Sequence, residues 1–415
     1  MGKNNFFEQI FIPVILGGNL GAYSIARAFH EAYGTKSITV SRLVTGSIGN
    51  SKILHTVVEP NMDKEDALLE CLHHFGQTFP NISKILLCSD DWHVQLAAGI
   101  RDRLGSGWIV PYASKEIIQH VTKKANFYRL CEEAGVDYPQ TVIYSSPEVE
   151  KIDLPFPFPV VIKPTNSMTY SLLSFEGKKK VYIARTRKEL ERIISVVRAG
   201  GYEEDLIIQE YIPGDDTSIH VLTCYTTTEG KTVMASMGQI LVEDHTPTGT
   251  GNHLAIRTLP ESDVAEQAAK LIERIGYTGF SNFDIKFDAR DGKYKFFELN
   301  ARLGRSNYYV TAAGNNVARY YVEDYVNHRE IAPSFTQKEV LYTVIPKRLL
   351  LKSLKDEKLR EKVKTMYREK LVHHPLKYRP IEKSLKHRFY ENASTMKFYL
   401  KFKKYPPHRE IPERV

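Results

Sequence analysis

Three oxygen-bearing side chains, those of Asp284, Glu298 and Asn300, lie in a stretch whose pattern predicts a β-hairpin. Side chains two residues apart on a strand point to the same face, so Glu298 and Asn300 share one. Carboxylate and amide oxygens are hard ligands that suit Mg²⁺, which commonly pairs one or two carboxylates with the phosphates of a substrate. The alternative is an ordinary charged hairpin on the surface of a sheet, and the hairpin alone does not decide between the two.

The register of the hairpin decides whether Asp284 joins the other two side chains. An aspartate-glycine pair that ends at Gly292 signals the turn, and the length of the loop sets the pairing of the strands. A two-residue loop places Asp284 opposite Leu299 and turns it away. A three-residue loop over residues 290–292, with the glycine in the left-handed conformation, places Asp284 opposite Glu298. A metal site at this hairpin therefore requires the three-residue loop.

Lys163 lies within the apolar run VVIKP, which predicts a strand. An unpaired cation is costly among apolar neighbours, so this lysine needs an anionic partner. A polar loop over residues 165–180 follows it. Upstream, residues 122–135 predict an amphipathic helix that ends at a glycine. Ser114 is a suitable N-cap for a helical run that starts there and precedes this helix.

Alternating strands and helices are predicted over about the first 110 residues, as in an open α/β layer. Residues 10–16 read as a buried strand, which is followed by a glycine-rich turn and a helical pattern. A strand, a glycine turn and a helix N-terminus together indicate a Rossmann-like unit that can hold an anion, with Gly18 and Asn19 as substrate contacts. The spacing is not GxGxxG, so tight-turn geometry alone explains the glycines equally well.

The charge of the chain is unevenly distributed. The 415 residues carry a net charge of +8, yet residues 341–415 hold 21 Lys/Arg against 8 Asp/Glu. The basic C-terminal segment should therefore meet something anionic, such as a phosphorylated substrate, an acidic membrane surface or nucleic acid. No apolar run approaches the length of a membrane span, and four scattered cysteines fit a reducing compartment, so we expect a cytoplasmic protein.

Four elements, read in order, resemble the ATP-grasp fold of carboxylate-amine ligases. They are a lysine eleven residues before a helix-ending glycine, a lysine-proline pair in a strand, a strand ending in an acid-aromatic-apolar-x-Gly turn, and an acid followed in the next strand by E-x-N-x-R. In this chain the elements are Lys124 with Gly135, Lys163-Pro164, Glu210 to Gly214, and Asp284 with Glu298, Asn300 and Arg302. The resemblance covers residues 10–330. The four elements in this order are stronger evidence for the family than any one of them alone.

The resemblance implies a fold that mixes α/β and α+β parts: a Rossmann-like layer, an ATP-grasp domain of two α+β subdomains, and a basic C-terminal extension. The expected boundaries are 1–113 for the layer, 114–330 for the ATP-grasp domain with subdomains of about 114–206 and 207–330, and 331–415 for the extension.

The resemblance also implies a nucleotide site and a metal site. Two lysines from separate elements can flank a triphosphate, while Mg²⁺, or Mn²⁺ in its place, neutralises the other side. The residues implied for ATP are Lys124, Lys163, Gln209, Glu210, Ile212 and Asp216, and those implied for the metal are Asp284, Glu298 and Asn300. Arg302 and Lys163 are implied in catalysis, because a forked cation on the metal face can stabilise an acyl-phosphate and its tetrahedral adduct.

Longer stretches, including QEYIPGDD and the basic C-terminus, resemble the D-aspartate ligases of Gram-positive bacteria. That resemblance implies a donor, D-aspartate, whose β-carboxylate ATP activates, and an anionic acceptor, a nucleotide-linked muramyl peptide whose lysine ε-amine is acylated. Arg305 and Ser306 are the candidates for the carboxylate of the amino acid, although Arg305 can equally be a solvated loop residue.

Two other functions stay open from the sequence. One keeps the fold and the chemistry but joins another amino acid or a dipeptide. The other treats the basic, aromatic C-terminus as a module for nucleic acid or for an anionic membrane surface. A charge run is usually only a solvated face, so we expect no nucleic-acid partner, while peripheral membrane contact stays open.

Overall fold

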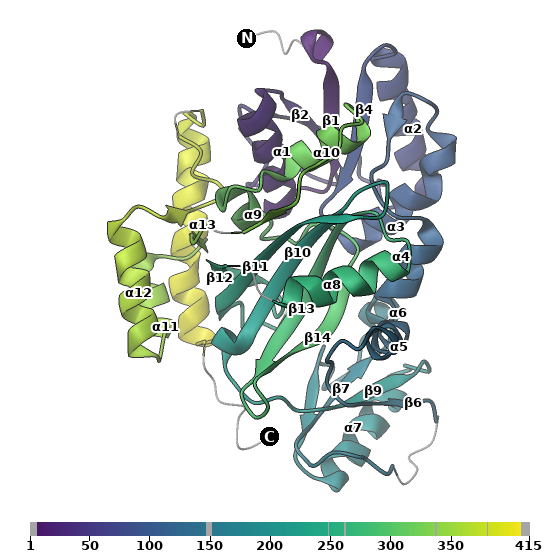
Figure 1. Cartoon of the computed structure of the whole chain (residues 1–415), viewed down its shortest axis with the longest axis vertical. Coiled ribbons are helices and arrows are strands. Elements are labelled where there is room, and N and C mark those ends of the chain that lie inside the picture. The colour runs from purple at the N-terminus through teal and green to yellow at the C-terminus, as the bar shows by residue number, and fades with distance from the viewer. Residues whose placement is uncertain are drawn as a thin grey trace.

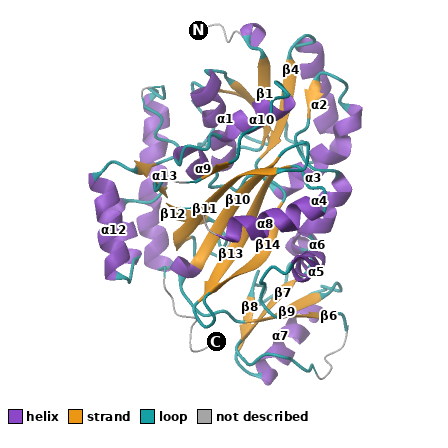
Figure 2. Ribbon diagram, in the orientation of Figure 1, coloured by secondary structure: helices purple, strands orange, loops and turns teal. Residues whose placement is uncertain are grey.

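The computed structural model in Figure 1 describes residues 6–146, 152–247, 249–260, 263–336, 338–379 and 381–407. Within this part of the chain, three β-sheets with their helices are stacked along the long axis of the molecule (Figures 1 and 2). No described helix combines the length and the apolar character that a membrane crossing requires.

The N-terminal layer is a parallel five-stranded sheet with the order β3-β2-β1-β4-β5. Its central strand has every residue buried, as the apolar run at residues 10–16 predicts. Strand order and parallel pairing confirm the Rossmann-like prediction. The strands are β1 (Phe11–Leu16), β2 (Ser37–Ser41), β3 (Leu54–Val58), β4 (Ser83–Cys88) and β5 (Trp108–Ile109), and the helices are α1 (Leu20–Tyr33), α2 (Glu65–Thr78) and α3 (Asp91–Ile100).

Two consecutive helices lead from this layer into the next part of the chain. They are α4 (Lys115–Thr122) and α5 (Lys124–Ala134). Ser114 caps the first by accepting from the backbone N–H of Ile117, as predicted. The single helix predicted over residues 122–135 is wrong at its start, because Lys123 is extended and separates the two helices. Its predicted glycine end is confirmed, since Gly135 adopts the left-handed conformation.

A small antiparallel sheet with the order β6-β9-β7-β8 packs on helix α7. The polar loop predicted over residues 165–180 is wrong in part, because it contains the short helix α6. Tyr170 in this helix is buried and contacts the rings of Tyr202 and Phe175, and these contacts anchor α6 to the core of the small sheet. The elements are β6 (Thr141–Tyr144), β7 (Val160–Pro164), α6 (Ser167–Leu172), β8 (Tyr182–Ala184), α7 (Arg187–Ala199) and β9 (Leu206–Glu210).

The third sheet has eight strands in the order β14-β13-β10-β11-β12-β16-β17, with β15 paired to β11. Figure 2 shows these long strands crossing the centre of the molecule, with α8 in front of them. The elements are β10 (Ile219–Thr226), β11 (Thr232–Glu243), β12 (His253–Leu259), α8 (Asp263–Arg274), β13 (Gly279–Asp288), β14 (Lys293–Asn300), α9 (Tyr308–Ala312), α10 (Val317–Tyr325), β15 (Ser334–Phe335), β16 (Leu341–Thr343) and β17 (Val372–His373).

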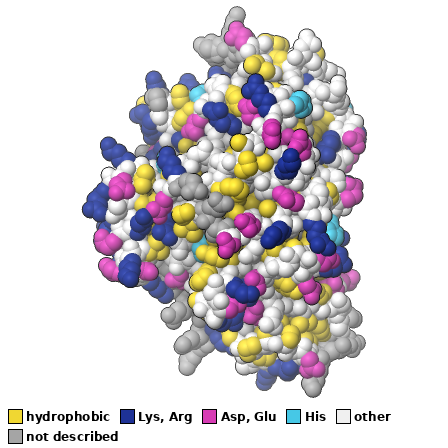
Figure 3. Space-filling view, in the orientation of Figure 1, with side chains coloured by type: hydrophobic (Ala, Val, Ile, Leu, Met, Phe, Trp, Pro, Cys, Tyr) yellow, Lys and Arg dark blue, Asp and Glu magenta, His cyan; other side chains and the backbone are white. Residues whose placement is uncertain are grey.

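The basic segment after residue 331 is built into this sheet rather than hanging from it. Its strand β16 pairs with β12, β17 continues the ladder, and β15 pairs with β11. It then adds three helices, α11 (Lys347–Ser353), α12 (Glu357–Arg368) and α13 (Leu385–Lys404). In Figure 3, Lys and Arg side chains lie along the left edge of the molecule, over these helices, interspersed with Asp and Glu.

Candidate active site

The β13–β14 hairpin has a different loop from the predicted one but the predicted pairing at its far end. Asp288 pairs with Lys293, so the loop has four residues, 289–292, and the three-residue loop is wrong. Gly292 does take the left-handed conformation, with φ of 73°. From the loop to Ile285, the pairing of β13 with β14 follows this four-residue loop. If the same register continued, Asp284 would lie opposite Phe297 and not opposite Glu298.

A β-bulge corrects the register. Ile285 pairs with Phe296 while its neighbour Asp284 pairs with Glu298, so Phe297 is the extra residue. A bulge of this kind places two residues of one strand opposite one of the other and re-aims the side chains beyond it. Asp284 therefore faces Glu298, as predicted, although through the bulge and not through the turn.

The two facing carboxylates are electrostatically unlike. Burial, the carboxylate of Glu298 and a hydrogen bond to it raise the pKa of Asp284 well above its usual range. The Nζ of Lys124 lies 3.0 Å from Glu298 Oε2, and this cation, together with Lys163, lowers the pKa of Glu298. The opposite shifts mean that Asp284 holds a proton more tightly than Glu298 does, and a divalent cation can take that proton's place.

The Asn300 side chain, the third member of the predicted metal set, lies beside this pair with its amide nitrogen toward Asp284 and its oxygen toward Arg302. Asn300 Nδ2 is 3.5 Å from Asp284 Oδ2 and also donates to the carbonyl of Asn282. Among the described residues no group of three or more His, Cys, Asp or Glu is arranged for a metal, so the set depends on the amide. Two carboxylates and an amide oxygen fit Mg²⁺, which keeps positions for water and phosphate.

Arg302 lies two residues beyond the end of β14 and reaches Asp91 of the N-terminal layer. Its Nη2 lies 2.8 Å from Asp91 Oδ2 and 3.5 Å from Asn300 Oδ1, while its Nη1 donates to the carbonyl of Leu303. The sequence alone did not assign Asp91 to the site. Its position in the sequence could have indicated a role, because Asp91 follows the predicted strand that became β4. Polar residues at the carboxyl end of a parallel strand lie where α/β sheets bind ligands.

Lys163, on β7, is nearly enclosed and held by two neutral partners. Its Nζ donates to Tyr128 Oη and to Gln209 Oε1, each at 3.1 Å. Burial, and secondly the cation of Lys124, lowers its pKa to about 7. Within the described part of the chain no carboxylate is hydrogen-bonded to Lys163, and a phosphate would supply the anionic partner that its apolar surroundings require.

The β9 end carries the residues predicted to contact the nucleotide base. Gln209 is fully buried, its backbone pairs with both neighbouring strands, and its side chain holds Lys163. The carboxylate of Glu210 accepts from the backbone of Gln140 and pairs with Arg290 of the hairpin loop at 2.8 Å. The carbonyl of Ile212 accepts from Lys286 Nζ at 2.8 Å. This edge thus joins the small sheet to the hairpin.

Asp216, predicted at the ribose, is buried against β11. Its carboxylate accepts from the backbone N–H of Glu243 and lies 2.9 Å from His245 Nε2, and that hydrogen bond raises the pKa of His245. Burial, and then the carboxylate of Asp216, raises the pKa of Glu243 to about 7.

The predicted substrate residues Gly18 and Asn19 lie just before α1, whose Gly21 packs against Arg305. Asn19 caps α1 by accepting from the backbone of Ala22, and the carbonyl of Gly18 accepts from the Thr45 hydroxyl. A Cβ on Gly21 would lie 3.2 Å from the Cα of Arg305, so the glycine lets the two segments touch.

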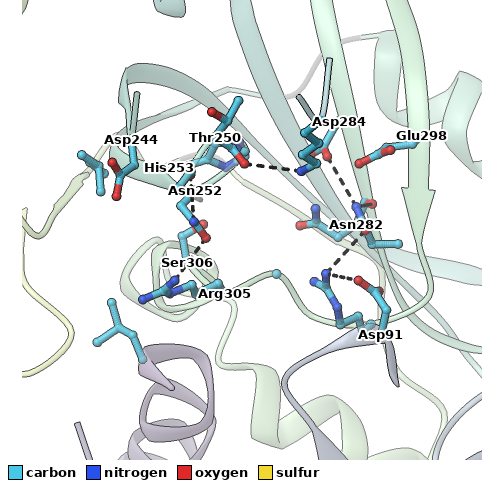
Figure 4. A pocket seen from close by; sticks show the side chains of 18 of the residues that line it. Asp91, Asp244, Thr250, Asn252, His253, Asn282, Asp284, Glu298, Arg305 and Ser306 are labelled. Atoms are coloured by element: carbon cyan, nitrogen blue, oxygen red, sulfur yellow. Dashed lines mark hydrogen bonds and ion pairs between the residues drawn. The ribbon is translucent and has the colours of Figure 1, made fainter. Parts of the chain in front are cut away.

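A cavity of about 1040 Å³ connects many of these groups. Figure 4 shows Asp284 and Glu298 at one side of it, Asp244 at the opposite side, and Arg305 with Ser306 between them. Gln209, Glu210, Ile212 and Asp216 do not line it, and neither do Lys163, Gly18 and Asn19. The lining residues from the predicted sites are Lys124, Asp284, Glu298, Asn300, Arg302, Arg305 and Ser306.

The far wall of the cavity comes from a segment that the sequence did not assign to the site. Helix α13 contributes Lys397, Phe398 and Lys401, and His374 lies near them. Their distance along the chain from the hairpin leaves no local pattern by which to find them.

Comparison with known sequences gives a consistent result. Residues 121–306 match the protein family described as the ATP-grasp domain. The D-aspartate ligase of Enterococcus faecium is 32% identical over 378 residues, which cover 88% of this chain and 90% of that protein. The D-alanine–D-alanine ligase of Wolbachia sp. subsp. Brugia malayi is 22% identical over 231 residues, which cover 50% of this chain and 66% of that protein.

Comparison with solved structures agrees on the fold. The L-amino acid ligase of Bacillus licheniformis matches with a TM-score of 0.50 and 16% identity, covering 75% of this chain and 70% of that one. The ADP complex of N5-carboxyaminoimidazole ribonucleotide synthetase matches with a TM-score of 0.55 and 13% identity, covering 80% of this chain and 81% of that one. At these identities the likeness is one of fold.

Proposed function

The chain belongs to the ATP-grasp family and is an ATP-dependent carboxylate-amine ligase, and on that premise we propose that it joins D-aspartate to a peptidoglycan precursor. The bond formed is an amide between the β-carboxylate of D-aspartate and the ε-amine of a lysine in a nucleotide-linked muramyl peptide. The observation that carries this proposal is the match to D-aspartate ligase, which spans 88% of the chain and so extends beyond the ATP-grasp domain.

In the first step, a carboxylate oxygen of the donor attacks the γ-phosphorus of ATP, and ADP leaves. Lys124 and Lys163 are our candidates for holding the phosphates, and the β9 end, with Gln209, Glu210 and Ile212, for the base. Asp216 is our candidate for the ribose. Mg²⁺, for which Mn²⁺ can substitute, would be held by Asp284, Glu298 and Asn300 and would neutralise the negative charge of the phosphates.

In the second step, the amine nitrogen attacks the acyl carbon of the acyl-phosphate, loses a proton, and expels phosphate. Arg302 is our candidate for stabilising the oxyanion, since its guanidinium is fixed by Asp91 and directed along the metal face. Arg305 and Ser306, which both line the cavity, are our candidates for the α-carboxylate of the donor. Gly18 and Asn19, just before α1, are our candidates for a further substrate contact.

The setting that we propose is the cytoplasm, where ATP and nucleotide-linked precursors are made. The four cysteines are free thiols, as expected for a reducing compartment. The reading of the C-terminus as a separate binding module is less favoured, because its strands complete the central sheet and its last helix lines the cavity.

Phosphate release tests the proposal directly. The protein is incubated with MgATP and a panel of D- and L-amino acids, each with and without the uridine-diphosphate-linked muramyl pentapeptide. We expect rapid release only when D-aspartate and the pentapeptide are both present. Release that depends on another amino acid, or on a dipeptide as acceptor, would show that the proposed substrates are wrong. The assignment as an ATP-dependent carboxylate-amine ligase would stand.

A further inference from the structure

The side of the cavity opposite the carboxylate pair is strongly cationic. Arg305, Lys397 and Lys401 line it together with one acid, Asp244. That acid is already satisfied, because its carboxylate lies 2.7 Å from Lys401 Nζ and accepts from the backbone and hydroxyl of Thr246. This end of the cavity therefore carries more positive than negative charge.

Lys397 is the lysine of this group without an ion pair among the described residues, and its Nζ lies 5.9 Å from the centroid of the Phe398 ring. By contrast, Lys401 pairs with Asp244, and Arg305 donates to Asn252 at 3.3 Å. Lys397 and Lys401 are four residues apart on one helix, so they repel each other. Burial, and then Lys401 and Arg305, lowers the pKa of Lys397, which shows that the three cations share one region.

Helix α13 is a fixed wall and not a loose tail. Just before it, Glu382 is fully buried and accepts from the hydroxyls of Tyr23 and Ser51 and from the backbone N–H of Lys52, which all belong to the N-terminal layer. Within the helix, the Tyr390 ring lies so close to Gly46 that a Cβ there would overlap it. The packing of α13 against the N-terminal layer therefore fixes the helix that carries Lys397 and Lys401 at the cavity.

We propose that Lys397, supported by Lys401, binds a phosphate of the anionic acceptor at this end of the cavity. This inference rests on the proposed function and adds to it the place where the acceptor is held. The position supports the acceptor over ATP, since α13 lies outside the segment 121–306 that matches the ATP-grasp domain. Its Lys401 pairs with Asp244, which lies on the side of the cavity opposite Asp284 and Glu298 (Figure 4). A lysine acts on phosphate as a mobile point charge, which suits an isolated anion site.

The first experiment measures binding without turnover. Uridine diphosphate is titrated calorimetrically into the protein, with MgADP present to fill the nucleotide site. We expect binding by the unaltered chain, about tenfold weaker binding by Lys397→Ala, as for loss of one charge-assisted contact, and recovery in Lys397→Arg. The control is Lys403→Ala, since Lys403 is an exposed lysine of the same helix that does not line the cavity.

Two results would overturn the site: no binding of uridine diphosphate by the unaltered chain, or equal binding by it and by Lys397→Ala. Because this measurement needs no ligation, it separates a failure of the anion site from a failure of the proposed reaction.

Steady-state kinetics distinguish a phosphate of the acceptor from a carboxylate of the donor. We expect Lys397→Ala to raise the KM for the acceptor about tenfold, with the KM for D-aspartate and kcat at saturation within about twofold of the unaltered chain. A rise confined to the KM for D-aspartate would assign Lys397 to the donor and reject the acceptor site.

Discussion

Asp284 faces Glu298 because one extra residue, Phe297, is accommodated in strand β14. The same residue links the hairpin to the neighbouring lysine: the Phe297 ring centroid lies 5.4 Å from Lys163 Nζ, and its carbonyl accepts from Tyr128 Oη at 3.0 Å. The bulge thus sets the carboxylate pair and packs against Lys163 at once, which ties the proposed metal site to the proposed phosphate site.

The carboxylate pair should make the stability of the protein depend on divalent cations. Mg²⁺ that binds only the folded state stabilises it by about 2.7 kcal/mol at a hundred times its Kd. We expect Mg²⁺ to raise the Tm of the unaltered chain and EDTA to reverse the rise. Asp284→Asn should melt in EDTA at least as high as the unaltered chain, because the amide stays neutral beside the carboxylate of Glu298, and should not respond to Mg²⁺. A full Mg²⁺ response in this variant would remove Asp284 from the metal site.

Glu298→Gln should abolish catalysis while preserving the fold. The amide keeps the size of the side chain but loses the charge that pairs with Lys124 and would bind the cation. We expect kcat to fall at least about a hundredfold, the order seen when one preorganised charge contact is removed from a transition state. Phosphate release measures the rate, and circular dichroism confirms folding. Near-normal turnover would defeat the assignment.

Nucleotide binding should take up a proton through Lys163. With a pKa of about 7 in the free protein, this lysine is mostly neutral at pH 8. An adjacent triphosphate favours the charged form and raises its pKa, so binding of ATP at pH 8 in EDTA, where no metal displaces a proton from Asp284, should take up close to one proton. Calorimetry in two buffers of different ionisation enthalpy measures the uptake. We expect none in Lys163→Met, and equal heats in both buffers for the unaltered chain would contradict the prediction.

Asp91→Asn tests whether the N-terminal layer positions Arg302. The substitution keeps the shape of the side chain but replaces an ion pair of 2.8 Å with a weaker contact. A guanidinium that is less well fixed should lower kcat by about tenfold, since small displacements of catalytic groups are costly. The KM for ATP should stay within about twofold, and a change in this KM alone would point instead to a role in nucleotide binding.

Glu382→Ala should destabilise the anchor of α13. It removes the acceptor of three hydrogen bonds in a fully buried place and leaves the donors of Tyr23 and Ser51 unsatisfied. We expect a loss of about 3 kcal/mol, measured by urea unfolding. Glu369→Ala, at an exposed residue, is the control and should change the free energy of unfolding by less than about 0.5 kcal/mol. Equal midpoints and slopes for the two variants would show that Glu382 is not an anchor.

Much of the fold follows from local pattern. The buried run before the first glycine turn becomes β1, Ser114 caps α4, and Gly135 ends α5 in the left-handed conformation. These features depend on residues within about one turn of one another. The helix α6 was missed because it depends on Tyr170 reaching Tyr202, a contact that composition does not reveal.

The candidate site likewise has features that follow from local sequence and features that depend on the tertiary structure. The sequence by itself determined which side chains can carry the chemistry, since Glu298 and Asn300 share a face through the period of a strand, and Lys163 requires an anion because of its apolar neighbours.

Only the tertiary structure decided how these residues are brought together. The bulge at Phe297, not the turn, aligns Asp284 with Glu298; Asp91 reaches Arg302 from the start of helix α3 in the N-terminal layer; and α13 closes the cavity from the far end of the chain. The physical reason is that such contacts form between segments tens to hundreds of residues apart, where packing of whole elements and not local backbone preference sets the geometry.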